Sequence, residues 1–220
     1  NIPAEMSFKP GGTLSLTVGS MTARIQSSGS DPMGRWSYTK FVGTRGNITT
    51  VVTAYQVCDK LATTATKKKS RTAADQQASM MRQRGITNTH PQKQFCKDLM
   101  LFLQACKTQN EELLLSGDVN KALGTKLSGM TKVCTELGLV DILMSHHGTN
   151  DNPTCIDYSL TTPHVAAACT TCGFEPFQYR FTGDHHGMFV EFNTNALFGS
   201  ATVDLSTHAE REFNSRDSAS

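Results

Sequence analysis

The stretch LLLSGDVN, Leu113–Asn120, joins a run of apolar residues to an Asp and an Asn placed two positions apart. A short apolar run that ends in such a polar turn is typical of a buried strand. A strand that simply ends in a turn needs a single polar cap, so two acceptor-bearing side chains indicate that this turn does more than end the strand. The same puzzle recurs in FTGDHHGMF, Phe181–Phe189, where Asp184 and His185 precede a second apolar run.

The composition is that of a globular domain. The 220 residues, 38% of them apolar and 18% charged, suffice for one domain with a sizeable core. The formal net charge is only +2, so any surface for nucleic acid has to be local. No apolar run approaches the roughly 20 residues that span a bilayer, and no signal peptide opens the chain. We therefore expect an intracellular protein, nuclear or cytoplasmic, without membrane contact. Because the sequence opens with Asn1 and not with Met, we also expect a piece of a longer polypeptide.

The seven cysteines indicate reduced thiols that mostly pack in the core, because their number is odd and their spacing irregular. Cys169 and Cys172, in CTTC, have the spacing of metal ligands, but a single C-x-x-C is half a zinc site. Two packed or surface thiols are the simpler interpretation.

The first third of the chain has the pattern of consecutive antiparallel strands separated by Gly-containing turns. GTLSLTVG (12–19) alternates with period two, and MTARIQSSG (21–29), WSYTKFVG (36–43) and NITTVVTAYQV (47–57) follow it. β-branched residues crowd the last of these segments, which predicts a central strand.

Helices and strands then interleave. Thr72 is the expected N-cap of a helix that Gly85 ends, and a third helix spans Met130–Leu137. Pro91 opens the second helix, whose expected buried stripe is Phe95, Leu99, Phe102, Leu103 and Cys106. Further strands are expected at LVDILM, TCIDYSL, and a final pair EPFQYRF and GMFVEFN. The order predicts a layered mixed α/β domain over residues 1–198, followed by a polar tail or linker over 199–220.

Acidic, amide and imidazole groups stand where apolar strands meet turns: Asp118, Asn120, Asp157, Asp184 and His185. Carboxylate and amide oxygens suit a hard cation such as Mg²⁺, and an Asp near it can deprotonate water for attack on phosphorus. A His held by a carboxylate suits contact with a phosphate oxygen. Taken one at a time, each group could instead be a turn or cap residue.

The order GDVN, IDY and GDHHGMFVEF, after DPMGRW and VVTAYQVC, resembles the endonuclease/exonuclease/phosphatase superfamily, which includes apurinic endonucleases and LINE-type retrotransposon endonucleases. The resemblance covers about residues 8–198. It implies a four-layer α/β/β/α sandwich whose first strands are missing from this chain.

By position in these motifs, Asp118 resembles the water-orienting Asp, and Asn120 its neighbour that stabilises the transition state. Asp157 resembles the carboxylate that pairs with the catalytic His, and His185 that His. Asp184 resembles the acidic residue at the metal-binding edge, and the ion implied is Mg²⁺ or Mn²⁺.

The sequence also departs from the family pattern. The family's Glu metal ligand lies on a strand before the first residues given, so we expect this fragment to be weak or inactive. Gly183 stands where Ser is usual, and Cys155 stands where a basic residue is usual. For Tyr55 and Arg35 we expect structural roles, packing for the former and an ion pair for the latter.

A local basic patch could grip the DNA backbone, and its residues are Lys67, Lys68, Lys69, Arg71, Arg82 and Arg84. A solvated linker followed by a helix end explains the same charges equally well.

These observations favour a metal-dependent endonuclease domain of a retroelement polyprotein that acts on DNA and continues into a reverse transcriptase domain. One alternative is a phosphatase for a small phosphorylated substrate. Another is a non-catalytic relic, or a module that binds nucleic acid without cutting it.

Overall fold

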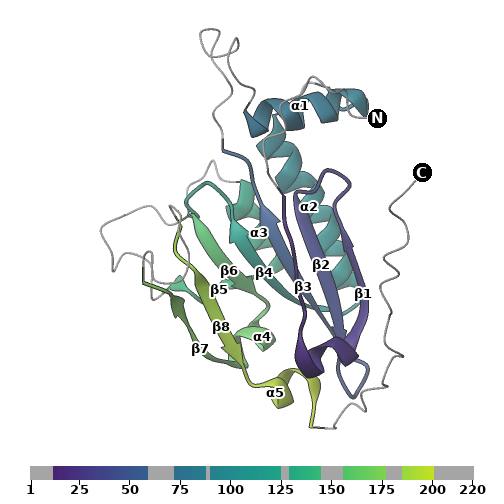
Figure 1. Cartoon of the computed structure of the whole chain (residues 1–220), viewed down its shortest axis with the longest axis vertical. Coiled ribbons are helices and arrows are strands. Elements are labelled where there is room, and N and C mark those ends of the chain that lie inside the picture. Colours follow the sequence, from purple (N-terminus) through teal and green to yellow (C-terminus); the bar gives the residue numbers. More distant parts are fainter. Residues whose placement is uncertain are drawn as a thin grey trace, which may run out of the picture.

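The computed structural model shows a mixed α/β fold with two sheets (Figure 1). None of the helices that it describes has the length and apolar character needed to cross a membrane. The residues described are 12–58, 72–87, 90–124, 129–144, 156–176 and 185–200.

The larger sheet has six strands in the order β1-β2-β3-β4-β6-β5. β3 and β4 are parallel, and the other neighbouring pairs are antiparallel. The carboxyl ends of β3 and β4 therefore lie at the same edge as the beginning of β6. The strands are β1 (Ile25–Ser30), β2 (Trp36–Val42), β3 (Ile48–Tyr55), β4 (Glu112–Asp118), β5 (Val140–Asp141) and β6 (Asp157–Thr161).

Helices α2 (Pro91–Thr108) and α3 (Gly129–Leu137) cover one face of this sheet, and the main core lies between them and the strands (Figure 1). Helix α1 (Ala73–Gln83) packs against α2. Helix α2 buries the apolar stripe that its sequence predicted, namely Phe95, Leu99, Leu103 and Cys106. Helix α1 begins with a capping box in which Thr72 and Asp75 bond each other's backbone.

The opposite face carries a second, smaller core and the second sheet. Its elements are β7 (Cys169–Phe174), β8 (Met188–Phe192), α4 (Pro163–Ala167), α5 (Thr194–Phe198) and the 3-10 helix η1 (Gly19–Arg24). The second core joins Phe41 of β2 to Val165, Ala168, Leu197 and Phe198. The described residues thus form a helical layer, a six-stranded sheet and a layer containing β7 and β8.

Most predicted elements are confirmed, including the three helices and the central place of β3. The strand expected at residues 12–19 is wrong: residues 12–18 form no ladder, and Gly19 begins η1. Ser15 instead bonds the hydroxyls of Ser37 and Thr53, while Leu14 and Leu16 are 85% and 84% exposed. The apolar face of the alternating pattern is turned to solvent, so alternation alone was misleading here.

The final strand pair also differs from the expectation. β8 pairs with β7, which contains the CTTC sequence, and most of the expected partner, 177–181, lies outside the described residues. Within β7, Cys172 donates its S–H to the carbonyl oxygen of Ile142 at 3.1 Å. Among the described residues, the group that could hold a metal lies elsewhere and includes neither cysteine of β7.

Candidate active site

Strand register places the site at the edge where β3 and β4 end and β6 begins. Tyr55 lies opposite Asp118 in the β3–β4 ladder, and Asp118 lies opposite Asp157 in the β4–β6 ladder. Three neighbouring strands therefore bring one polar side chain each to the same row. The parallel pairing of β3 and β4 is what brings their two carboxyl ends together.

Gly117 allows β4 to approach β3 closely just before Asp118. Its φ is +154°, and a Cβ built on it would lie 1.8 Å from the carbonyl oxygen of Ala54. Only a residue without a Cβ fits this place. The Gly of the GDVN motif thus sets the position of the Asp that follows it.

Asp118 and Asn120 interact directly. The backbone N–H of Asn120 donates to Asp118 Oδ1 at 2.8 Å, and Asn120 Nδ2 donates to Asp118 Oδ2 at 2.9 Å. Nδ2 also donates to the carbonyl oxygen of Gln56 at 2.7 Å. Asn120 has a φ of +50°, a conformation that Asn tolerates better than most residues. The turn after β4 therefore folds the amide back onto the carboxylate.

His185, at the start of the segment leading into β8, reaches both carboxylates. Its Nδ1 lies 2.8 Å from Asp157 Oδ2, and its Nε2 lies 3.9 Å from Asp118 Oδ2. One potential ligand atom from each of the three residues lies within 4.8 Å of the others. Segments that are distant in sequence thus converge on a cluster of two carboxylates and an imidazole.

Burial and neighbouring charges shift the pKa values of Asp118 and of the adjoining Tyr55. Burial raises the pKa of Asp118, and the neighbouring Asp157 raises it further, against hydrogen bonds from Asn120 and the charge of His185. Burial also raises the pKa of Tyr55, with a contribution from Asp118. A carboxylate with a raised pKa is a better proton acceptor than an ordinary Asp.

Tyr55, for which packing was expected, lies opposite Asp118 in the β3–β4 ladder, and the charge of Asp118 contributes to its raised pKa. The sequence did not predict this placement beside Asp118. Arg35, by contrast, has the expected structural role: its side chain is buried, and its guanidinium lies 2.8 Å from both Asp31 and Asp98.

The remaining predicted residues do not join the cluster in the described part of the chain. Asp184 lies outside the described residues, as do Lys67, Lys68, Lys69 and Arg71 of the proposed basic patch. Arg82 and Arg84 are exposed near the end of α1, and Arg84 donates to the carbonyl oxygen of Pro32 at 2.9 Å.

The donor set fits a small divalent cation. Asp118 and Asp157 offer the one or two carboxylates that Mg²⁺ usually takes from protein, and partial exposure leaves room for water. His185 suits softer ions as a ligand, but its Nδ1 is already engaged with Asp157.

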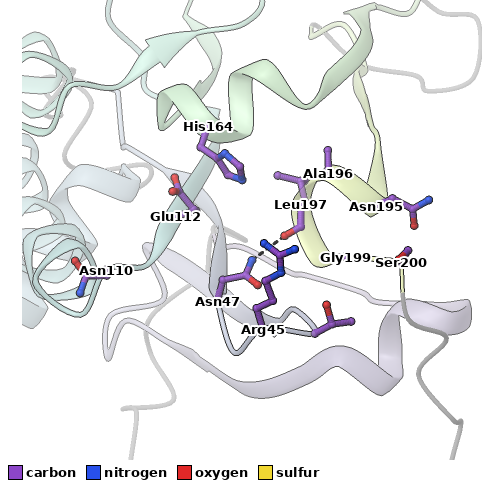
Figure 2. Close-up of a pocket in the computed structure, with 11 residues that line it drawn as sticks. Arg45, Asn47, Asn110, Glu112, His164, Asn195, Ala196, Leu197, Gly199 and Ser200 are labelled. Carbon is purple, nitrogen blue, oxygen red and sulfur yellow. Dashed lines mark hydrogen bonds between the residues drawn. The ribbon is translucent and has the colours of Figure 1, made fainter.

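A polar cavity of about 530 Å³ lies at the end of β4 opposite the cluster (Figure 2). Arg45 and Asn47 of the β2–β3 turn, Glu112 and His164 contribute to its lining. Glu112 begins β4 and Asp118 ends it, so the cavity and the cluster are about 20 Å apart along the strand. The cavity contains none of the described site residues.

Comparison with known proteins agrees with this architecture. No protein-family model and no curated protein matches the sequence. Among solved structures, a 3′-5′ exonuclease from Neisseria meningitidis matches with a TM-score of 0.50 and 19% identity, over 74% of this chain and 66% of that one. An AP endonuclease from Archaeoglobus fulgidus matches with a TM-score of 0.49 and 15% identity, over 77% and 71%. An endonuclease/exonuclease/phosphatase family protein from Bacteroides thetaiotaomicron matches with a TM-score of 0.40 and 12% identity, over 76% and 61%.

The chain thus spans about two thirds of the length of the Neisseria exonuclease, whose likeness supports the fold. At 19% identity, the comparison shows a shared fold. The resemblance recognised in the motifs is confirmed at the level of fold: the chain shares its mixed α/β fold with the Neisseria exonuclease.

Proposed function

We propose that the protein hydrolyses phosphodiester bonds of DNA with the help of a divalent metal ion, as the endonuclease domain of a retroelement polyprotein. The convergence of Asp118, Asp157 and His185 at one sheet edge carries this proposal. The DNA substrate and the retroelement setting, with a reverse transcriptase domain downstream, come from the resemblance of GDVN, IDY and GDHHG to the family motifs.

Asp118 and Asp157 are the described residues that would hold the ion, with Asp184 as the further ligand that the resemblance implies. When bound, Mg²⁺ or Mn²⁺ would polarise a phosphoryl oxygen and offset negative charge on the phosphate. The fit of the two carboxylates to a hard cation supports this role.

Asp157 and His185 would act as a pair. A hydrogen bond between Nδ1–H of His185 and Asp157, across the observed 2.8 Å, would fix the orientation of the ring. The other ring nitrogen, Nε2, faces the Asp118 side of the cluster. An imidazolium held there would donate to a non-bridging oxygen of the scissile phosphate and stabilise the charge that develops during attack.

Asp118 would orient the attacking water and accept its proton, the role of the residue that it resembles in the family motif. The water oxygen bonds to phosphorus, and the bond from phosphorus to the leaving oxygen breaks. One water proton passes to Asp118, and the leaving oxygen takes a proton from solvent. The donor Nδ2 of Asn120 would hold Asp118 in place and help to stabilise the transition state.

Nicking of supercoiled plasmid DNA in Mg²⁺ tests the proposal. Asp118→Asn and His185→Asn are each expected to lower the nicking rate by roughly 10²–10⁴-fold, the usual contribution of a positioned acid or base. His164→Asn, in the distal cavity (Figure 2), makes the same chemical change as His185→Asn at the other end of the sheet and should nick at the wild-type rate.

Because this chain is expected to be weakly active, nicking is measured at high protein concentration and over long incubation. Undiminished nicking by both site variants would refute the proposal. No nicking by the wild-type chain at any Mg²⁺ or Mn²⁺ concentration would refute hydrolysis by this chain and leave the non-catalytic alternative. Turnover of a soluble phosphomonoester together with indifference to DNA would instead indicate a phosphatase.

A further inference from the structure

Another cavity, of about 350 Å³, adjoins the candidate active site where α2 and α3 begin. Gln56, His90, Lys93, Lys121 and Gly129 contribute to its lining. Gly129 keeps the space open, because a Cβ at this position would lie 2.7 Å from the sulfur of Cys96. The volume is at the lower end of that of small-ligand sites, which begins at about 300 Å³.

Gln56 connects this cavity to the catalytic residues. Its backbone N–H donates to the carbonyl oxygen of Asp118 at 2.9 Å, and its carbonyl oxygen accepts from Asn120 Nδ2 at 2.7 Å. Lys121 directly follows Asn120, so their Cα atoms are only about 3.8 Å apart. A ligand in the cavity would therefore lie beside the cluster of Asp118, Asp157 and His185.

The cavity is positively charged. Lys93 lies in the first turn of α2, an 18-residue helix whose amino end adds partial positive charge. Lys121 lines the cavity as well, and none of the described residues that line it carries a carboxylate. Burial raises the pKa of the Cys96 thiol to about 11, so the thiol adds no negative charge at neutral pH.

One residue of the lining also carries an unsatisfied hydrogen-bond acceptor. Gln56 is only 3% exposed, and its Oε1 has no hydrogen-bond partner within the described part of the chain. A buried polar atom without a partner is costly, and a ligand group that donates would satisfy it. The lining thus combines cations for an anionic group with an acceptor for an N–H group, the two features of a nucleotide.

We propose that this cavity binds the nucleotide next to the scissile phosphate, with Lys93 and Lys121 on its phosphate and Gln56 Oε1 as acceptor for a base N–H. The inference rests on the proposed function and makes it more specific, because a second phosphate contact favours a polymeric substrate over a small phosphate ester. The adjacent cavity of about 330 Å³ between α2 and α3 shares Lys93 and adds Lys97, whereas its Lys132 is paired with Glu136 at 3.5 Å.

The test is equilibrium binding of a fluorescein-labelled 20-base-pair DNA duplex to the full chain, followed by anisotropy at several salt concentrations in EDTA, so that no hydrolysis occurs. Lys93→Gln and Lys121→Gln should each lower the slope of log affinity against log salt by ~0.9, and the double variant by ~1.8. Arg45→Gln, at the far end of the sheet (Figure 2), removes one charge elsewhere and should keep the wild-type slope.

Replacement of both lysines by Arg should restore the slope, which separates loss of charge from misfolding. An unchanged slope in the double Gln variant, an equal loss in Arg45→Gln, or no binding by the wild-type chain would overturn the inference. Lysine-dependent binding without plasmid nicking would refute the proposed function and retain the phosphate site. Nicking together with an unchanged salt slope in the double Gln variant would refute the phosphate site and retain the proposed function.

Discussion

Replacing Gly117 by Ala tests whether close approach of β4 to β3 positions Asp118. The new Cβ would lie 1.8 Å from the Ala54 carbonyl oxygen, whereas real Cβ contacts are essentially never shorter than 3.0 Å, so the strands must part by about 1.2 Å. A misplacement of about 1 Å can cost roughly 10²-fold in rate. The φ of +154° adds strain of about 1–3 kcal/mol for a residue with a side chain.

We therefore expect Gly117→Ala to nick plasmid DNA about 100-fold more slowly and to melt roughly 2–12 °C lower by circular dichroism. Gly46→Ala is the matched control, because Gly46 lies in the β2–β3 turn with a φ of +78°, and a Cβ added there would meet nothing within 4 Å. It should lose some stability to strain and keep its activity. Wild-type activity and melting temperature in Gly117→Ala would show that the strand approach does not position Asp118.

Three further predictions address the site, the core and acid stability. Asp157→Asn removes the carboxylate 2.8 Å from His185, and steady-state nicking kinetics should show kcat reduced by roughly 10²–10⁴-fold with little change in KM. Phe95→Ala empties a position that is 1% exposed, and urea unfolding should show a loss of about 3–5 kcal/mol, so a loss below about 1 kcal/mol would contradict this core. Burial opposes ionisation of Asp31, but the hydrogen bonds and charge of Arg35 prevail and lower its pKa. A lowered folded-state pKa stabilises the protein above the unfolded value of about 3.9, and the stability is lost as the pH falls through the folded value. Asp31→Asn should therefore flatten the fall in unfolding free energy below about pH 4, measured by urea titration from pH 7 to pH 2, and an unchanged fall would exclude Asp31 as its source.

Local patterns predicted the elements well where one face was consistently apolar. The stripe of α2 and the Thr72 cap of α1 were both readable, because helix periodicity and capping depend on residues only a few positions apart. The strand predicted over residues 12–19 was wrong because strand pairing does not depend on local sequence alone. Their alternation satisfies a strand pattern, but pairing requires a free strand edge and a partner, which a local pattern does not specify.

The site was also partly readable. Asp118 and Asn120 are neighbours in sequence, so a turn after a buried strand was sufficient to bring them together. The pairing of Asp157 with His185 was expected only from the family resemblance, and the structure places them 2.8 Å apart. The contribution of Tyr55 to the surroundings of Asp118 was missed, because it depends on the parallel register of β3 and β4.

The sequence by itself determined which segments are apolar, where helices begin, and which residues carry acidic, amide and imidazole groups. The tertiary structure alone decided that β3, β4 and β6 end or begin in one row, and that the lysines at positions 93 and 121 share a cavity beside it. The physical reason is range. Propensity and periodicity act over a few residues, whereas register, burial and electrostatic coupling arise only when distant segments are packed against each other.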